Sequence, residues 1–209
     1  MKTASAARLA SNRFERRRGR TRRDLLAAAT KVLAEKGLHD TKISDIAAAA
    51  DVGVGTFYLH FPDKESLFDA VVEETVTRMK ATIDEARGAE TSPLAAVRAA
   101  NVAFFRFAHE NREVFKIVFG HAAAYNDLIR RAQALFIADL EATIRDGIAC
   151  GAFAALPPTV VAQAIIGMAT QTLSWWTEHQ SVPIETLIET TTTLALRGMV
   201  PAAEGGRHG

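Results

Sequence analysis

The stretch Thr41–Phe61, TKISDIAAAADVGVGTFYLHF, predicts two short helices separated by a tight turn. Thr41 is a candidate N-cap, because a threonine oxygen accepts a hydrogen bond from a free N–H of the first helical turn. One apolar face follows at helical spacing, made by Ile43, Ile46, Ala47 and Ala50. The run Asp51–Gly53 ends this helix, since glycine tolerates the backbone angles of a sharp turn. A second helix of about two turns is expected over Val54–His60.

A helix, a glycine-containing turn and a second short helix form a helix-turn-helix unit, whose second helix enters the DNA major groove. Gly55 lies on that second helix, where the missing side chain lets the backbone approach DNA closely. The helix should end before Pro62, because proline disfavours helical geometry at the preceding residue. This stretch therefore predicts a DNA-binding element.

The surrounding residues resemble the DNA-binding half of the tetracycline-repressor (TetR) family. The match covers about the first third of the chain without gaps. It is carried by Leu25-Leu26, Ala28-Ala29, Gly37, Thr41, Ile46-Ala47, Val52, Gly55-Thr56-Phe57-Tyr58, His60-Phe61, Lys64-Glu65 and Leu67. The remaining chain resembles the family only in its helical pattern and length. The resemblance implies a DNA contact for Tyr58, and a second domain whose ligand alters the spacing of two DNA-reading heads.

The second helix of this unit, expected over Val54–His60, is called the reading helix below. The candidate DNA contacts are side chains with hydroxyl, imidazole or cationic groups, together with the small residues of the reading helix. They are Ser44, Val54, Gly55, Thr56, Tyr58, His60 and Lys64, and the arginines Arg16, Arg17, Arg18 and Arg20. A lysine at a helix N-terminus opposes the helix dipole, which favours a phosphate partner for Lys64. The arginines belong either to a solvated leader or to an arm that touches phosphates or a minor groove.

Composition indicates an ordinary globular protein, with 209 residues, 48% hydrophobic and 23% charged. The net charge of +1 is unevenly distributed: residues 1–64 hold 13 Lys/Arg and 7 Asp/Glu, and the rest holds 12 and 17. A basic first part fits a nucleic-acid-facing domain. The single cysteine, Cys150, permits no intrachain disulfide, so we expect a cytoplasmic protein. No apolar run reaches the ~18 residues of a membrane span, so no membrane partner is expected.

The predicted fold class is all-α, in two domains. We expect a basic flexible arm at 1–19, a three-helix DNA-binding domain at 20–66, a helical ligand-binding and dimerisation domain at 67–199, and a disordered tail at 200–209. Thr21 should cap the first long helix and Gly37 should end it. Further helices should begin at Asp63, at Ser92-Pro93, at Asn111, near Ala123, at Pro157-Pro158 and at Pro183.

Polar groups on apolar helix stripes are the candidates for a small-molecule pocket, because burying one without a partner costs about 1–3 kcal/mol. With the aromatic and Met residues around them, the predicted ligand set is Asn101, Phe104, Phe105, Phe115, Phe119, Phe136, Asp139, Met168, Gln171, Thr172 and Trp175. For each residue taken alone, a satisfied core group or a dimer contact explains the pattern equally well.

The sequence predicts a homodimeric repressor that binds a near-palindromic double-stranded DNA operator and is released by an apolar or amphipathic effector. The last two long helices are the expected dimer surface, through Ile165, Leu173, Leu187, Thr191 and Leu194. A constitutive DNA-binding regulator without a ligand is the alternative. An enzyme is not expected: the histidines have no metal-ligand spacing, no phosphate loop is present, and no catalytic residue, metal or cofactor is predicted.

Overall fold

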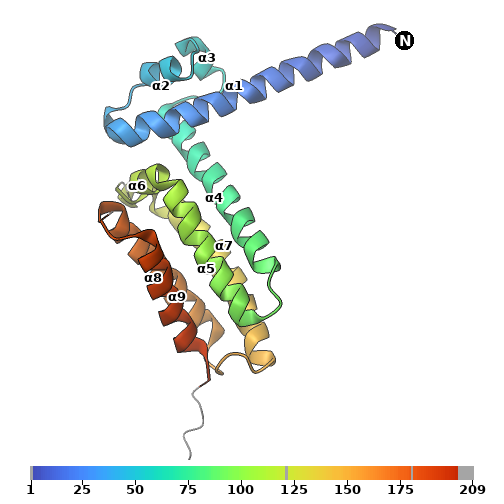
Figure 1. Cartoon of the computed structure of the whole chain (residues 1–209). Coiled ribbons are helices and arrows are strands. Elements are labelled where there is room, and N and C mark those ends of the chain that lie inside the picture. Colours follow the sequence, from blue (N-terminus) through green and yellow to red (C-terminus); the bar gives the residue numbers. More distant parts are fainter. Residues whose placement is uncertain (1, 121, 180, 202–209) are drawn as a thin grey trace, which may run out of the picture. The chain divides into compact units, whose positions relative to one another are not determined.

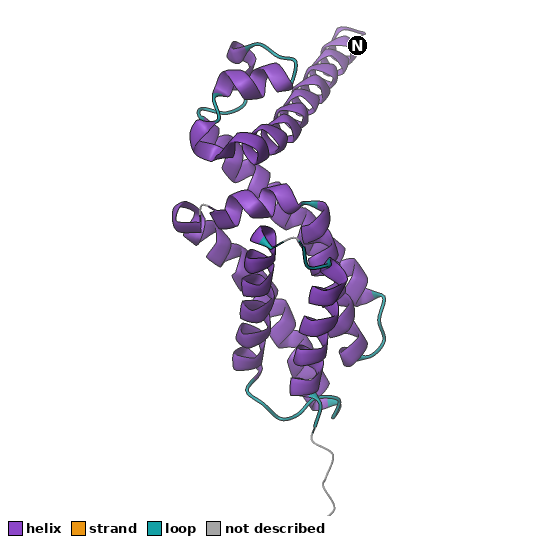
Figure 2. Ribbon diagram, turned by 60° about the vertical axis from the view of Figure 1, so that its left-hand side comes forward, coloured by secondary structure: helices purple, strands orange, loops and turns teal. Residues whose placement is uncertain are grey.

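The computed structural model describes residues 2–120, 122–179 and 181–201 (Figures 1 and 2). Within these ranges it contains nine helices and no strand, which confirms the predicted all-α class. The chain divides into two compact units, Met1–Thr75 and Val76–Gly209. This division falls inside a helix, later than the boundary expected between residues 66 and 67. None of the described helices is long and apolar enough to cross a membrane.

The first unit contains the predicted helix-turn-helix. Its helices are α1 (Lys2–Asp40), α2 (Ile43–Ala49), α3 (Val54–Tyr58) and the first part of α4 (Lys64–Gly88). The fully buried Leu25, Ile46, Phe57 and Phe68 come one from each of these helices. Burying a large apolar side chain stabilises the fold by about 1.5–3 kcal/mol, so these residues fix α2 and α3 on their support.

The first helix begins earlier than the sequence predicts. α1 is helical from Lys2, whereas the sequence predicts a basic flexible arm over residues 1–19; the flexibility of this arm stays a prediction. Thr21 is not a cap: its Oγ1 donates to the carbonyl of Arg17 within the helix, at 3.1 Å. The predicted stop at Gly37 is confirmed as a kink, where φ is +76° and only glycine is unstrained.

The turns around α2 also differ from the prediction. The N-cap position belongs to Lys42, and the hydroxyl of Thr41 instead donates to the carbonyl of Gly37 at 2.6 Å. Between α2 and α3 the left-handed residue is Asp51, with φ +54°, whereas Gly53 has the ordinary φ of −73°. Asp is one of the few residues that tolerate this region, because its short polar side chain can bond locally.

The second unit is a bundle of the end of α4 with α5 (Pro93–Glu110), α6 (Arg112–Gly120), α7 (Ala122–Ala149), α8 (Pro158–Glu178) and α9 (Ile184–Met199). α5 packs against α7 and α9, and α8 packs against α6, α7 and α9. The predicted starts at Asp63 and Ser92 are confirmed: Asp63 accepts from the N–H of Ser66, and Ser92 from the N–H of Ala95. Residues 202–209 of the predicted tail lie outside the described residues.

Two apolar clusters hold this bundle together. The larger contains Phe105, Leu173 and Trp176, and the smaller contains Ile144, Phe153 and Leu196. The indole Nε1 of Trp176 donates to the carbonyl of Val182 at 2.8 Å, so the buried ring has its polar group satisfied. A side chain at Gly147 would overlap the ring of Phe153, which explains a glycine inside α7.

Candidate functional site

The reading helix α3 turns one face inward and one outward. Phe57 is fully buried, whereas Val54, Tyr58 and Leu59 are 44%, 55% and 73% exposed. The rings of Phe57 and Tyr58 meet edge to face at 5.5 Å, so the buried ring orients the exposed phenol. An exposed apolar and aromatic face on so short a helix is available to a partner.

Gly55 lies on the same outward face. A Cβ built at Gly55 meets no atom within 4 Å, so no packing within the chain requires glycine there. Glycine inside a helix costs about 1 kcal/mol relative to alanine. The predicted close approach of α3 to DNA would account for glycine at this position and stays a prediction.

His60 connects α3 to the arginines of α1. Burial first, and then the charges of Arg18 and Arg22, hold the pKa of His60 below its ordinary value of 6.5. The guanidinium of Arg22 also lies over the ring of Phe61, 5.1 Å from its centre. Arg18 was predicted as a contact, whereas Arg22 was not, because the contact of Arg22 with Phe61 joins α1 to the segment after α3. The structure thus brings a basic cluster to the end of the reading helix.

The other predicted arginines lie on the exposed surface of α1. Arg16, Arg17 and Arg20 are all exposed, and Arg20 makes a long ion pair with Asp24, at 3.9 Å. Exposed pairs of this kind contribute little to stability, so these side chains remain available to phosphates. Their geometry is a helical stripe rather than an extended arm.

Ser44 and Thr56 differ in accessibility. Ser44 is exposed on α2, while Thr56 is half-buried and its N–H donates to the carbonyl of Gly53 at 2.8 Å. Next to Ser44, Asp45 accepts from Lys36 Nζ at 2.9 Å and from the N–H of Lys42 at 3.2 Å. These two bonds hold the pKa of Asp45 below its ordinary value. The carboxylate of Asp45 therefore satisfies the backbone N–H of Lys42, the residue that caps the start of α2.

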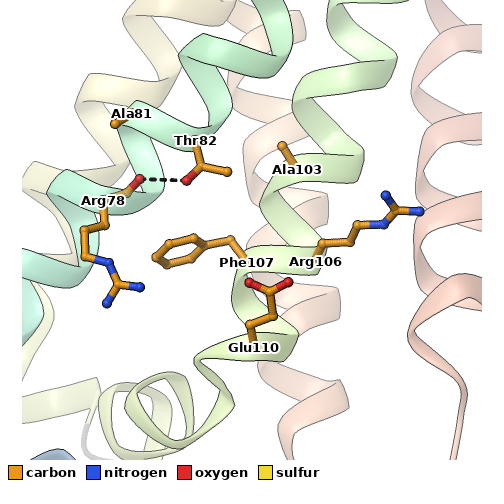
Figure 3. Close-up of a pocket in the computed structure, with 7 residues that line it drawn as sticks. All are labelled: Arg78, Ala81, Thr82, Ala103, Arg106, Phe107 and Glu110. Atoms are coloured by element: carbon orange, nitrogen blue, oxygen red, sulfur yellow. Dashed lines mark hydrogen bonds between the residues drawn. The ribbon is translucent and has the colours of Figure 1, made fainter. Parts of the chain in front are cut away.

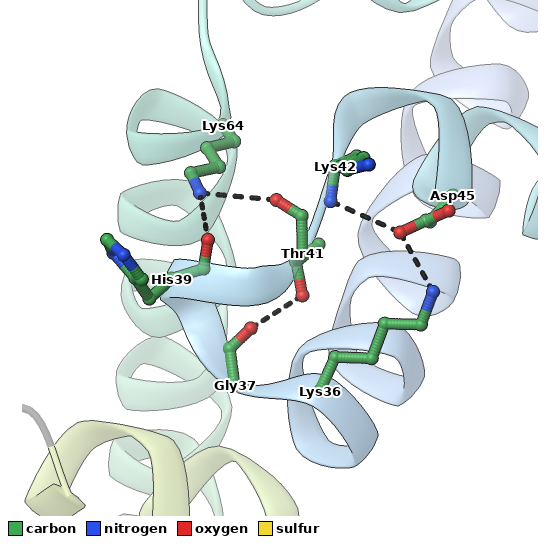
Figure 4. Close-up of polar contacts among 7 residues, drawn as sticks. All are labelled: Lys36, Gly37, His39, Thr41, Lys42, Asp45 and Lys64. Atoms are coloured by element: carbon green, nitrogen blue, oxygen red, sulfur yellow. Dashed lines mark hydrogen bonds and ion pairs between the residues drawn. The ribbon is translucent and has the colours of Figure 1, made fainter.

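Lys64 is bonded to the chain itself. Its Nζ donates to the carbonyls of His39 and Thr41, at 3.2 Å each (Figure 4). His39 lies in the last turn of α1 and Thr41 in the link to α2, whereas Lys64 starts α4. The lysine at a helix N-terminus, which the sequence explained by a phosphate, thus has a structural partner within the unit.

In the second unit, Asn101 is satisfied internally. Its Nδ2 donates to the hydroxyls of Thr191 and Thr192 on α9, at 3.0 and 2.8 Å. The hydroxyl of Thr191 in turn donates to the carbonyl of Leu187 at 2.7 Å. The polar group on the apolar stripe of α5 therefore joins two helices, and its role in binding a ligand stays a prediction.

Asp139 is likewise paired. Lys80 on α4 lies 2.7 Å from Asp139 on α7 and 2.6 Å from Asp84, which also accepts from Arg87. Hydrogen bonds to Asp139 and then Asp84 raise the pKa of Lys80 above its ordinary value. This charged network ties the second half of α4 to α7.

The predicted aromatic ligand residues form the core. Phe105 and Phe115 are buried, and Phe104, Phe119 and Phe136 pack against the same cluster. Met168 and Thr172 are half-buried on α8, whereas Gln171 is exposed. Trp175 is 44% exposed and stacks on His179, with ring centres 4.6 Å apart. The role of this set in binding a ligand stays a prediction.

An open pocket lies between α4 and α5. Its volume is about 490 Å³, within the ~300–1,000 Å³ of small-molecule sites. Its lining is Arg78, Ala81, Thr82, Ala103, Arg106, Phe107 and Glu110 (Figure 3). None of these residues was predicted from the sequence. Exposed charges on adjacent helices look like ordinary surface until the fold brings them together.

The predicted dimer contacts are partly wrong. Leu173, Leu187 and Thr191 are at most 4% exposed within their own chain, so they cannot meet a partner's surface. Leu194 is exposed, as are Val160 and Trp175 on α8. Among the described residues, no group of three His, Cys, Asp or Glu side chains is arranged to hold a metal ion.

Comparison with known proteins agrees with this arrangement. The model of the bacterial regulatory proteins of the tetR family matches residues 25–71, and the model of the tetracyclin repressor-like C-terminal domain matches residues 90–199. The HTH-type transcriptional regulator YhgD of Bacillus subtilis is 28% identical over 165 residues, 77% of this chain and 86% of YhgD.

Solved structures share the fold. The fatty acid degradation regulator FadR of Bacillus halodurans superposes with a TM-score of 0.76 at 23% identity, over 84% of this chain and 94% of that one. FadR of Bacillus subtilis, solved with stearoyl-CoA, gives 0.75 at 20% identity, over 84% and 97%. Because the second family model alone matches more than half of the sequence, the chain belongs to the TetR family of DNA-binding transcriptional regulators.

Proposed function

We propose that this regulator is a repressor that binds a near-palindromic operator as a homodimer and leaves it when a small molecule occupies the second unit. The observation that carries the proposal is the continuity of α4, which begins in the first unit, shortly after the reading helix, and lines the pocket in the second. One helix with residues in both units is a physical element whose equilibrium both ligands can bias.

DNA binding in this proposal uses the outward face of α3 and the arginines of α1. Tyr58, Ser44 and the cluster of Arg18, Arg22 and His60 supply phosphate contacts, and Val54, Gly55 and Thr56 face the bases. Two heads related by two-fold symmetry would read half-sites about 34–36 Å apart. The dimer would form through the exposed faces of α8 and α9, where Val160, Trp175 and Leu194 leave apolar surface uncovered. A cytoplasmic location is part of the same proposal.

An amphipathic effector is supported by the open pocket and by the fold neighbour solved with stearoyl-CoA. Coupling requires a differential affinity, since a ligand that binds both states equally shifts nothing. A tenfold weakening of DNA binding needs about 1.4 kcal/mol of such preference.

A constitutive regulator without a ligand is the second candidate. It is favoured by the pairing of Asn101 with two threonines and of Asp139 with Lys80, because these groups need no ligand to satisfy them. Neither candidate assigns a reaction to the protein, so we do not propose an enzyme.

DNA selected from a random pool by the purified protein supplies a probe for both candidates. Fluorescence anisotropy then measures its affinity with and without stearoyl-CoA and a fractionated cell extract. Loss of affinity with a compound that calorimetry shows to be bound supports the repressor. Unchanged affinity with every bound compound favours the constitutive regulator.

A further inference from the structure

We infer that the pocket between α4 and α5 binds the acidic headgroup of an amphiphile, a carboxylate or phosphate attached to an apolar body. This inference deepens the proposed function and rests on it for the link to DNA release. It uses only residues of the second unit, from Arg78 to Glu110.

Arg78 is the group that would hold the anion. Its guanidinium lies over the ring of Phe107, 5.6 Å from the ring centre, and in Figure 3 this ring points from α5 toward Arg78 on α4. Stacking uses the face of a guanidinium and leaves its in-plane N–H groups free to bind a carboxylate or phosphate through two parallel bonds. None of the ion pairs found among the described side chains includes Arg78, although Glu110 lines the same pocket.

The remaining lining fits an apolar body. Ala81 on α4 and Ala103 on α5 present only methyl groups, and the ring of Phe107 closes the wall between them (Figure 3). The hydroxyl of Thr82 is already used, since it donates to the carbonyl of Arg78 at 3.0 Å. An alkyl chain or flat ring therefore meets no unsatisfied polar group on this wall.

The charges of the pocket favour an anion. Arg78 and Arg106 carry positive charge and Glu110 carries the single negative charge of the lining. The head of Arg106 extends away from Phe107 in Figure 3, so it contributes to the local potential rather than to the stacked site. The negative charge of Glu110 repels an anion. Removing Glu110 should therefore raise the affinity for an acidic ligand, and removing the charge of Arg78 should lower it.

Three eight-carbon amphiphiles separate the headgroup from the tail: octyl phosphate, octanoate and octanol, each titrated calorimetrically below its micelle concentration. Wild-type protein should bind the two anions and discriminate against octanol at least tenfold. Arg78→Gln should weaken octyl phosphate about tenfold and leave octanol unchanged, and Glu110→Gln should tighten octyl phosphate severalfold. The control is Arg98→Gln, which removes an exposed arginine of α5 that does not line the pocket.

Each outcome decides the inference. Equal binding of octanol and octyl phosphate, unaltered affinity in Arg78→Gln, or no binding of either anion to the wild type would each overturn it. All variants change exposed side chains, and circular dichroism checks that they fold. Preference for octanoate over octyl phosphate would assign a carboxylate, and the reverse a phosphate. If the anion binds as predicted but operator affinity does not change, the site stands and the proposed release from DNA fails.

Discussion

Lys64 Nζ lies 3.2 Å from the carbonyl oxygen of Thr41, which ties the start of α4 to the link between α1 and α2. The same ammonium donates to His39, and Thr41 in turn donates to Gly37. A cation thus bonds carbonyls that the ends of helices leave without partners. Any effect of Lys64 on DNA binding therefore includes its effect on the position of the helix-turn-helix.

Lys64→Ala should lower the stability of the protein as well as its DNA affinity. Removing a half-buried charged donor from two carbonyls should cost about 1 kcal/mol, measured by urea denaturation. Lys31→Ala is the control, because Lys31 is an exposed lysine of α1. A normal urea midpoint with a salt slope flattened by about 0.9 would instead assign Lys64 to a phosphate.

Gly55→Ala should separate stability from function. Alanine should stabilise α3 by about 0.5–1 kcal/mol, because no atom lies near the added methyl group. The same methyl should clash with DNA and weaken binding of the selected DNA at least tenfold. Gly88→Ala, outside the first unit, should leave DNA affinity unchanged. Wild-type affinity in Gly55→Ala would show that α3 does not approach DNA closely.

The pKa of His60 predicts a pH dependence of stability. Since the folded pKa is lowered, the unfolded chain binds more protons below the ordinary value of 6.5. The contribution of His60 to the free energy of unfolding should therefore be fully present above pH 6.5. It should be lost progressively as the pH falls from 6.5 towards the folded pKa. His60→Gln should remove this part of the urea-midpoint profile. An identical profile in the variant would mean that His60 has the same pKa in both states.

Asn101 should act as a structural group. Asn101→Asp should destabilise the second unit more than Asn101→Leu, because a carboxylate cannot donate to Thr192 and faces the hydroxyl of Thr191, which is already donating to Leu187. We expect a loss of about 1–3 kcal/mol for the aspartate, measured by urea denaturation at fixed protein concentration. Unchanged stability together with weaker ligand binding would return Asn101 to a pocket.

The sequence predicted the features that depend on neighbouring residues. The cap at Ser92, the cap at Asp63 and the kink at Gly37 follow from local backbone chemistry, and the structure contains all three. The continuation of α1 to Lys2 was missed, because an arginine-rich segment without an apolar stripe gives no helical period to read.

The candidate sites were harder to predict because their partners are distant in sequence. Asn101 and Thr192 are 91 positions apart, and Lys64 and His39 are 25 apart. A polar residue in an apolar stripe signals a partner without saying whether the partner is a side chain or a ligand. No sequence pattern indicated the residues that line the α4–α5 pocket, since exposed arginines are common on helices.

The central claim is that one ligand in the second unit and DNA at the first oppose each other. The direct test is a complete linkage cycle: DNA affinity with and without saturating octyl phosphate or stearoyl-CoA, and ligand affinity with and without saturating DNA. We predict that the small molecule lowers the affinity for DNA, and DNA lowers the affinity for the small molecule, by the same factor of at least ten. Reciprocity of binding free energies requires the two factors to be equal. Equal DNA affinities for the free protein and for the protein that calorimetry shows to be saturated would contradict the claim.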